Sequence, residues 1–256
     1  MEDQLVISGV INMARMWEAP ARAMGRPWVR WDDAWAADSE LPSRFFSRVI
    51  VVRRLDPAAA PGLAGRIHEF YASHPDGGPY VVVDTWATID LEPHGFKRAM
   101  TLPFMVRLPG GPAGPRPTRE IREARSDSDL ADFIHVVVEG FGIPELTDVP
   151  ASRVMDERVL EERPLRLWVA YEEGRPVGTS AAYVADGVVG VYLVGVVPDM
   201  RRKGIGEALT WQATLVDRAS PCTLQASTGG RPIYERMGYV TAAECAMWIS
   251  KNRRDR

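Results

Sequence analysis

Cysteine is the scarcest of the informative residues in this chain. Only Cys222 and Cys245 occur in 256 residues, which is too few for a disulfide framework or a cysteine-based metal cluster. The histidines show no metal-ligand spacing with them. There are four: His68, His74, His94 and His135. The sequence therefore predicts no metal site, and a reducing cytoplasm is the expected location.

Long apolar runs and an excess of charge of one sign are missing as well. No stretch of about 20 apolar residues is present, and the first 17 residues are too polar for a signal peptide. The net charge is -3, and the first 118 residues carry 13 basic and 13 acidic residues, so the small acidic excess lies in the second half. We expect no membrane-spanning segment and no nucleic-acid partner. The sequence leaves a homodimer open.

The most informative stretch combines an apolar strand, a cationic glycine loop and a helix. Val188 to Val197 is an almost unbroken apolar run, typical of a strand covered on both faces, and Pro198 ends it. Residues 201–206 read RRKGIG and open an amphipathic helix. The N–H groups at a helix N-terminus attract anions, and glycine lets a phosphate approach the backbone. We therefore predict a phosphate-binding site, with a solvated basic turn as the alternative.

Two common phosphate motifs do not fit this loop. A dinucleotide-binding loop needs a third glycine where the chain has Leu209, and the P-loop pattern is absent. The stretch from Arg201 to Gly206 instead resembles motif A of the GCN5-related N-acetyltransferase (GNAT) family, Gln/Arg-x-x-Gly-x-Gly/Ala. In that family the loop holds the pyrophosphate of acetyl-coenzyme A, so the resemblance implies this molecule as co-substrate. The cofactor-binding residues that it implies are Val194, Gly195, Val196, Arg201, Arg202, Lys203, Gly204, Ile205, Gly206, Glu207 and Ser227.

The order of predicted elements in the second half is similar to the same family. Residues 119–250 predict a strand, a helix, three strands with turns at 173–174 and 186–187, a helix, a strand, a helix and a strand. Tyr234 to Tyr239 resembles the family's motif B, Tyr-x-x-x-Gly-Phe/Tyr. We therefore expect an α/β fold with a mixed sheet (α+β), of the GNAT acyl-CoA N-acyltransferase type, and a catalytic domain over 116–256.

The first half resembles a weaker copy of this pattern. Its predicted elements are a helix over 4–24, an irregular Trp-rich segment over 25–43, a strand over 45–55, a helix over 56–73, a strand over 80–86, a turn over 90–96, a strand over 97–108 and a linker over 109–117. Asp56 and Pro57 stand where the phosphate loop belongs, and no G-x-G follows. We interpret 1–115 as a degenerate GNAT-like domain, in tandem with the second, that cannot hold coenzyme A. An add-on of unrelated fold is the alternative.

The resemblance also implies catalytic roles. Tyr234 is the candidate general acid, because a phenol stays protonated at neutral pH and can protonate the leaving thiolate. A backbone N–H of the strand can stabilise the oxyanion. Ser227 stands where the family often has asparagine; its hydroxyl can hydrogen-bond to the pantetheine arm but is shorter. For the general base the candidates are Glu139, Glu145 and a relaying water.

The predicted function is transfer of an acetyl group from acetyl-coenzyme A to a primary amine of a small acceptor. Two alternatives stay open. One is a non-catalytic sensor or scaffold that binds acyl-coenzyme A, which a tandem with one inactive half makes plausible. The other is an acetyltransferase that acts on a peptide or protein amine. The sequence does not name the acceptor.

Overall fold

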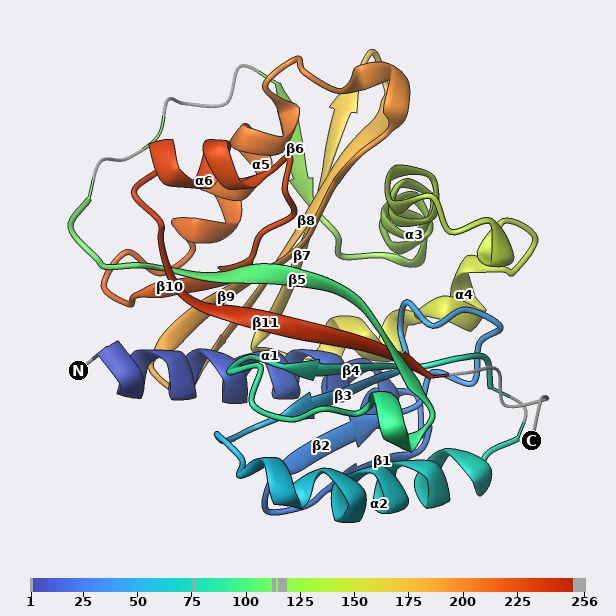
Figure 1. The fold of residues 1–256 in the computed structure, drawn as a ribbon. Coiled ribbons are helices and arrows are strands. Elements are labelled where there is room, and N and C mark those ends of the chain that lie inside the picture. Colours follow the sequence, from blue (N-terminus) through green and yellow to red (C-terminus); the bar gives the residue numbers. More distant parts are fainter. Residues whose placement is uncertain (1, 76, 112–113, 115–118, 251–256) are drawn as a thin grey trace. The chain divides into compact units, whose positions relative to one another are not determined.

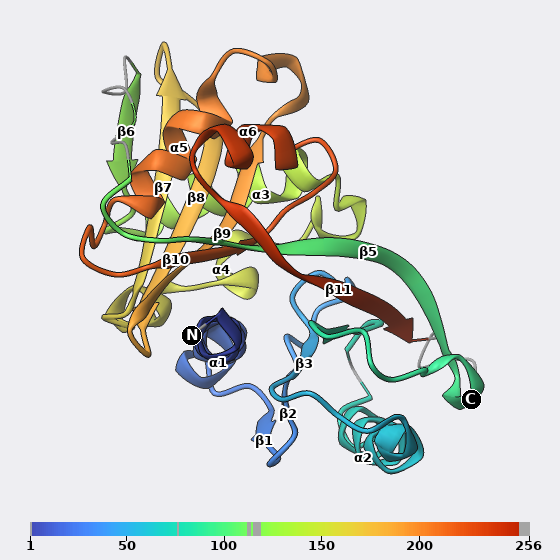
Figure 2. The same cartoon turned by 60° about the vertical axis from the view of Figure 1, so that its left-hand side comes forward.

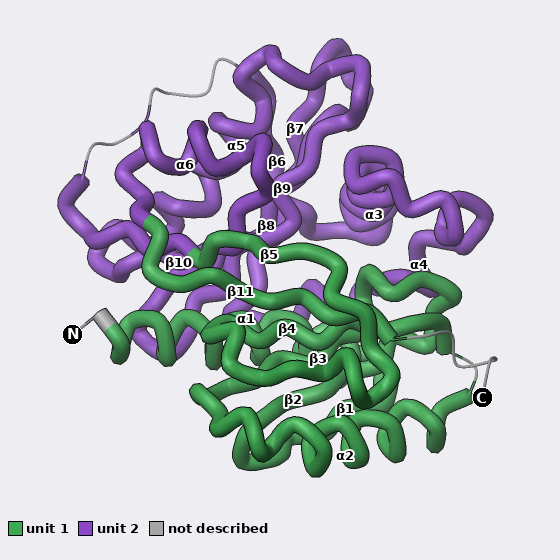
Figure 3. Tube along the Cα trace, viewed as in Figure 1, with its two compact units in different colours: residues 1–104, 241–256 green, residues 105–240 purple. Residues whose placement is uncertain are grey.

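The computed structural model describes residues 2–75, 77–111, 114 and 119–250 (Figure 1). Two compact units divide the chain: unit 1 is residues 1–104 with 241–256, and unit 2 is residues 105–240 (Figure 3). This division differs from the expected boundary at 115/116. One strand runs through 104/105 without a break, and the last strand returns the chain to unit 1. The assignment of an acetyltransferase-like domain to each half stays a prediction.

Unit 1 is built on a sheet in the order β1-β2-β3-β4-β11. Its elements are α1 (Glu2–Ala23), β1 (Trp28–Arg30), β2 (Ala34–Ala37), β3 (Arg48–Val51), the 3-10 helix η1 (Pro57–Ala59), α2 (Ala60–Ala72), β4 (Val81–Asp84), η2 (Glu92–His94), the first part of β5 (Phe96–Arg107) and nearly all of β11 (Val240–Ser250). β3 and β4 are parallel and α2 connects them. Figures 1 and 2 show α1 and α2 on opposite faces of this sheet.

The helices of unit 1 and the strands β3, β4 and β5 form where the sequence predicts them, whereas β1 and β2 were not predicted. Asp56 caps η1 as expected: its carboxylate accepts a hydrogen bond from Ala58 N at 2.8 Å. The expectation of an irregular segment over 25–43 is wrong in part, because β1 and β2 lie there. β2 reads AWAA and pairs with β3. Alanine has little strand propensity, so burial against neighbouring elements rather than local preference selects this strand.

Unit 2 contains the strand order β10-β9-β8-β7-β6. Its elements are β6 (Glu120–Glu123), α3 (Asp127–Phe141), η3 (Pro144–Leu146), α4 (Ala151–Val154), η4 (Glu157–Glu161), β7 (Leu165–Glu172), β8 (Arg175–Ala185), β9 (Val188–Val196), η5 (Pro198–Met200), α5 (Ile205–Thr214), β10 (Cys222–Gln225) and α6 (Arg231–Arg236). β6 to β9 are antiparallel, and β10 is parallel to β9. The expected α/β fold with mixed sheets is confirmed.

Most of unit 2 forms where the sequence predicts it. The turns between β7, β8 and β9 have two successive residues with positive φ each, at 173–174 and 186–187, which is the geometry of tight hairpins. Ser126 caps α3 through its hydroxyl. The three short helices η3, α4 and η4 were not predicted individually, and α5 starts only at Ile205 and ends at Thr214. The predicted linker over 109–117 lies largely outside the described residues.

The central sheet of unit 2 is covered by α3 on one face and by α5 on the other. A Cβ added at Gly195 of β9 would meet the Phe141 ring of α3 at 2.7 Å. A Cβ added at Gly178 of β8 would meet Ile205 and Leu209 of α5 at 2.8 and 2.7 Å. Two strand glycines thus let the helices approach the sheet closely. Among the described helices, none is long and apolar enough to cross a membrane.

Candidate active site

The predicted site begins with an irregularity in β9. The register pairs Gly195 with Thr179 and Tyr192 with Ala181, so that two residues of β9 lie opposite one residue of β8. Leu193, one of the two, has a φ of 50°, and its carbonyl accepts a hydrogen bond from the Thr179 hydroxyl at 2.9 Å. This is a β-bulge, which bends a strand and redirects its backbone groups. The bulge lies directly before the predicted cofactor-binding stretch 194–196.

β9 extends beyond the residues that pair with its parallel neighbour β10. The described register joins β10 to β9 at only two positions, Cys222 with Val189 and Thr223 with Gly190. β9 continues to Val196. Backbone N–H and C=O groups on that side of 191–196 therefore have no β10 ladder to join, and buried backbone groups need partners. The second half of β9 offers a strand edge to a polar ligand.

The cationic loop ends in a helix start without a side-chain cap. Arg202 has a φ of 61° and Gly204 a φ of 78°, and α5 follows at Ile205. No side chain caps this helix, and Ala208 N donates the first helical bond, to Gly204 O. The N–H groups of residues 205–207 precede that bond and lie at the positive end of the helix dipole. This geometry suits an anion, as the sequence predicts.

The three cations of the loop have different surroundings. Arg201 donates from Nε to Val196 O at 3.2 Å and from a terminal nitrogen to Gly140 O at 2.8 Å, so its guanidinium ties the end of β9 to the end of α3. Lys203 Nζ lies 3.1 Å from Met200 Sδ. Arg202 is exposed. The long-range attraction of these charges remains, but the side chain of Arg201 makes structural hydrogen bonds in addition to any role at the phosphate.

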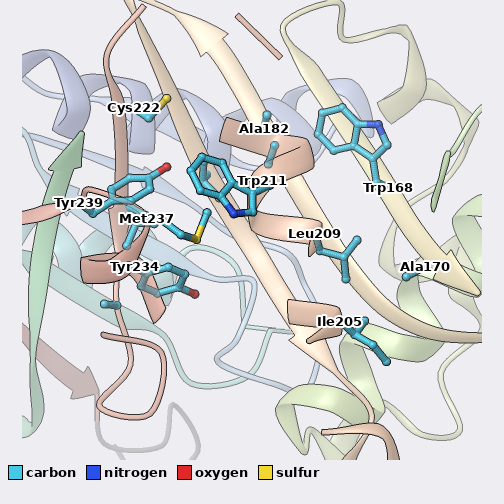
Figure 4. Packing of buried hydrophobic residues seen from close by; sticks show 14 of the residues in the cluster. Trp168, Ala170, Ala182, Ile205, Leu209, Trp211, Cys222, Tyr234, Met237 and Tyr239 are labelled. Carbon is cyan, nitrogen blue, oxygen red and sulfur yellow. The ribbon is translucent and has the colours of Figure 1, made fainter. Parts of the chain in front are cut away.

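Tyr234 lies beside the middle of α5, at Thr210. It is 9% exposed on α6, and burial raises its pKa while an interaction with the Thr210 hydroxyl offsets part of that rise. Thr210 itself donates to Gly206 O at 2.7 Å. Figure 4 shows the Tyr234 ring near Met237, with its hydroxyl directed away from Tyr239. The motif B tyrosine and the motif A helix are thus brought together by the fold.

Ser227 and Glu207 also have protein contacts. The Ser227 hydroxyl accepts from Gly230 N at 3.1 Å, and its carbonyl accepts from the N–H groups of residues 230 and 231 at 3.0 Å. Ser227 therefore holds the turn that precedes α6, and its hydroxyl keeps its hydrogen and one acceptor position for a pantetheine contact. A Cβ at Gly230 would meet the Tyr234 ring at 2.9 Å, so close packing of Tyr234 needs this glycine. The Oε2 atom of Glu207 lies 3.8 Å from a terminal nitrogen of Arg236.

Glu139 and Glu145 are placed differently. Glu139 is in the last turn of α3, 3.5 Å from His135 Nε2 and 3.8 Å from a terminal nitrogen of Arg175. It lines a cavity of about 490 Å³ between α3 and residues 143–151. Glu145 is exposed on η3 and is not among the residues that line this cavity. Of the two carboxylates, Glu139 is therefore the better placed for an acceptor amine.

Several residues of this region were not singled out from the sequence. Thr179 holds the bulge, Thr210 links Tyr234 to α5, and Gly140 approaches the Val196 backbone, where an added Cβ would meet Val196 N at 3.3 Å. Only the glycines within elements carry a sequence signal, because an isolated glycine in a strand or helix indicates close backbone approach. The described residues contain no group of three or more His, Cys, Asp or Glu side chains that could hold a metal.

The comparisons with known proteins agree with the resemblance seen in the sequence. Residues 163–241 match the family model described as an acetyltransferase (GNAT) domain. A GCN5-related N-acetyltransferase from Kribbella flavida superposes with a TM-score of 0.63 at 21% identity, covering 93% of this chain and 95% of that one. Residues 163–241 are thus similar to a GNAT acetyltransferase domain, and the solved structure shares the fold of nearly the whole chain.

Two further solved structures share this fold. A GCN5-related N-acetyltransferase from Sphaerobacter thermophilus has a TM-score of 0.55 at 19% identity, with 86% of this chain and 77% of that chain covered. A putative acetyltransferase of the GNAT family from Novosphingobium aromaticivorans has a TM-score of 0.54 at 14% identity, with 94% and 99% covered. No curated protein matches the sequence. At these identities the structures establish the fold and not a substrate.

Proposed function

We propose that this protein transfers an acetyl group from acetyl-coenzyme A to a primary amine of a small acceptor. One arrangement carries the proposal: β9 bulges and parts from β10, the loop 201–204 then leads into a helix that starts without a side-chain cap, and the phenol of Tyr234 lies beside that helix. A strand edge, an anion site and a proton donor are the three elements that this reaction needs. The GNAT domain model over 163–241 supports the same reaction class.

The donor would be held by backbone groups more than by side chains. The N–H groups of residues 205–207 would bind the pyrophosphate, and Gly204 and Gly206 leave room for it, since an added Cβ at Gly204 would meet nothing within 4 Å and one at Gly206 only Val196 Cγ2. The edge of β9 at 193–195, which lies beyond its pairing with β10, would pair with the amide groups of the pantetheine arm. Acetyl-coenzyme A supplies the thioester that is attacked.

The transfer moves one acyl group and two protons. The neutral amine nitrogen attacks the thioester carbonyl, the C–N bond forms, and the C–S bond breaks. The departing thiolate takes the phenolic proton of Tyr234, which burial keeps on the oxygen at neutral pH. The proton lost by the amine goes to Glu139 or to water, and Tyr234 regains its proton from solvent after release of coenzyme A.

The loop after β3 in unit 1 favours a single binding site for acetyl-coenzyme A per chain. After β3, the position that corresponds to the cationic loop holds Asp56, whose carboxylate caps its own helix start at Ala58 N. A carboxylate at this place occupies the N–H group and repels a phosphate. Unit 1 is therefore proposed as a domain that does not bind coenzyme A.

The proposal is tested by incubating the protein with acetyl-coenzyme A and a panel of primary amines. Release of free thiol is followed, and the acetylated product is identified by mass spectrometry. The expected result is amine-dependent thiol release with a matching N-acetyl product. If the protein bound coenzyme A but released no thiol with any small amine or peptide tested, the proposed enzyme activity would be refuted and the non-catalytic sensor would be supported. Turnover with peptides alone would move the acceptor class to proteins.

A further inference from the structure

The cavity beside α3 has the dimensions and the lining of a ligand site. Its volume of about 490 Å³ falls in the range typical of pockets for small molecules. One wall is a stripe of α3 at i, i+3/i+4 and i+7/i+8 spacing, which includes Ala131, Ile134 and Val138. The other wall comes from residues 143–151, where Leu146 and Val149 are among the apolar members. Both walls belong to unit 2.

The lining carries one acidic group and no lysine or arginine. Among the residues described around the cavity, Glu139 supplies the only carboxylate, and His135 and Thr147 supply the other polar side chains. The two basic partners of Glu139 are distant, at 3.5 Å for His135 and 3.8 Å for Arg175, whereas charged hydrogen bonds are usually about 2.7–2.9 Å. Arg175 makes its short bonds, of 2.7 and 3.1 Å, to Asp199. The carboxylate of Glu139 therefore retains capacity to accept from a ligand.

The end of the cavity at Glu139 adjoins the bulged strand. Gly140 and Phe141 follow Glu139 directly, and they contact the backbone of β9 at Val196 and Gly195. Arg201 fixes this junction, because it binds the carbonyls of Gly140 and Val196 at once. The polar end of the cavity is thus tied to the strand on which the thioester lies in the proposed function.

We propose that this cavity selects the acceptor, and that the acceptor is a monoamine with an apolar body. This inference rests on the proposed function. The apolar body fills the space between α3 and residues 143–151, and the single ammonium pairs with Glu139 and loses one proton to solvent before the neutral nitrogen attacks. A second ammonium or a set of hydroxyls would lie against apolar walls without partners, which costs free energy. Polyamines and sugar amines are therefore poor acceptors, whereas arylalkyl and alkyl amines are good ones.

The first test compares amines that have different bodies. Wild-type protein is assayed with 2-phenylethylamine, hexylamine, ethanolamine and spermidine at saturating acetyl-coenzyme A. We expect kcat/KM for the two apolar amines to exceed that for ethanolamine and spermidine by at least about tenfold, because one well-buried apolar group is worth about one such factor. Equal or higher values for ethanolamine or spermidine would overturn the inference and leave the proposed function intact.

The second test uses variants and binding, so that it does not depend on turnover. Val138→Phe reduces the cavity and Val138→Ala enlarges it, and binding of 2-phenylethylamine by calorimetry should weaken in the first and persist in the second. Glu139→Gln should weaken it about ten- to a hundredfold, the usual worth of a charged hydrogen bond. Asp148→Asn is the matched control, since Asp148 is an exposed carboxylate on the same loop that does not line the cavity.

The outcomes separate the two proposals. If 2-phenylethylamine binds wild type and the Asp148→Asn protein but not Val138→Phe, the cavity is the amine site, even when no thiol is released and the transferase proposal fails. If thiol is released but Val138→Phe and Glu139→Gln leave KM for every amine unchanged, the cavity is not the acceptor site. Affinity for coenzyme A, measured in each variant, should stay at the wild-type value. A parallel loss of that affinity would mean that the variants act on the fold, and would contradict the inference.

Discussion

Replacing Gly206 by glutamate tests the predicted phosphate site most directly. Gly206 lies in the first turn of α5, and an added Cβ would meet only Val196 Cγ2, at 3.6 Å. A side chain therefore fits there without strain. Gly204 is a poorer position for the test, because its φ of 78° would add a conformational cost of about 1–2 kcal/mol for any other residue. A loss of binding at Gly206 can thus be assigned to the ligand and not to unfolding.

The magnitude follows from the charge that the substitution brings to the anion site. A carboxylate on the first turn lies within about 5 Å of a phosphate bound to the N–H groups, and two unit charges at that distance repel by about 3 kcal/mol at an effective dielectric constant of about 20. Since about 1.4 kcal/mol corresponds to a tenfold change in affinity, coenzyme A should bind at least about 100-fold more weakly. The free energy of unfolding should rise slightly, because glycine is the worst residue for a helix interior apart from proline.

Calorimetry with coenzyme A measures this effect, and Gly206→Gln is the matched control. Glutamine has the size of glutamate without its charge, so it should weaken binding far less. Gly206→Ala should bind nearly as well as wild type, in line with the alanine that motif A accepts at this place. Thermal unfolding of all three variants checks that the fold is intact.

Two results would refute the reasoning. Equal losses for glutamate and glutamine would mean that bulk and not charge excludes the ligand, so the electrostatic account of the loop would be wrong. Affinity within about threefold of wild type for both, which corresponds to less than about 0.7 kcal/mol, would place the pyrophosphate site elsewhere in the molecule.

Four further predictions concern Tyr234, the number of coenzyme A sites and the two cysteines. Tyr234→Phe should lower kcat by roughly 10²–10⁴ with a nearly constant Kd for acetyl-coenzyme A; unchanged turnover in a steady-state assay would make Tyr234 a packing residue. Burial raises the pKa of Tyr234, so the loss of activity from its deprotonation should lie above about pH 10, and a basic limb near pH 8 that vanishes in Tyr234→Phe would contradict this assignment. Calorimetry should find a single coenzyme A site per chain, because Asp56 caps the corresponding helix start in unit 1, and a stoichiometry of two would show that this half also binds. Burial raises the pKa of Cys222 to about 11, and Cys245 is also buried. A disulfide reagent at pH 8 should therefore react rapidly with neither thiol until denaturant is added. A fast reaction of Cys222 in the native protein would show that the core around it opens.

The elements that the sequence predicts best are those with local causes. Asp56 and Ser126 cap helices where short polar side chains precede helical patterns, and the hairpin at 186–187 occurs where Asp-Gly separates two strands. These signals depend on a few neighbouring residues, because caps and tight turns are decided by local hydrogen bonds and by the φ values that each residue tolerates. They therefore survive without knowledge of the tertiary fold.

The geometry of the candidate site is harder to predict from the sequence, because its residues come from separate elements. The loop 201–206 is visible as a motif, but the two hydrogen bonds of Arg201 depend on where α3 ends relative to β9. The bulge places a leucine at positive φ, a conformation that no sequence signal for leucine predicts. The cavity at Glu139 exists only because residues 143–151 return along α3.

Local sequence patterns were enough to predict the strand, loop and helix around residues 188–214, the tyrosine that resembles motif B and the α/β class, because periodicity, glycine and helix starts depend on a few neighbouring residues. The bulge of β9 against Thr179, its separation from β10 and the interaction of Tyr234 with Thr210 became visible only in the folded chain. The reason is physical: strand pairing and burial join residues that are far apart in the chain, and their free energy comes from contacts that do not exist until the whole fold forms.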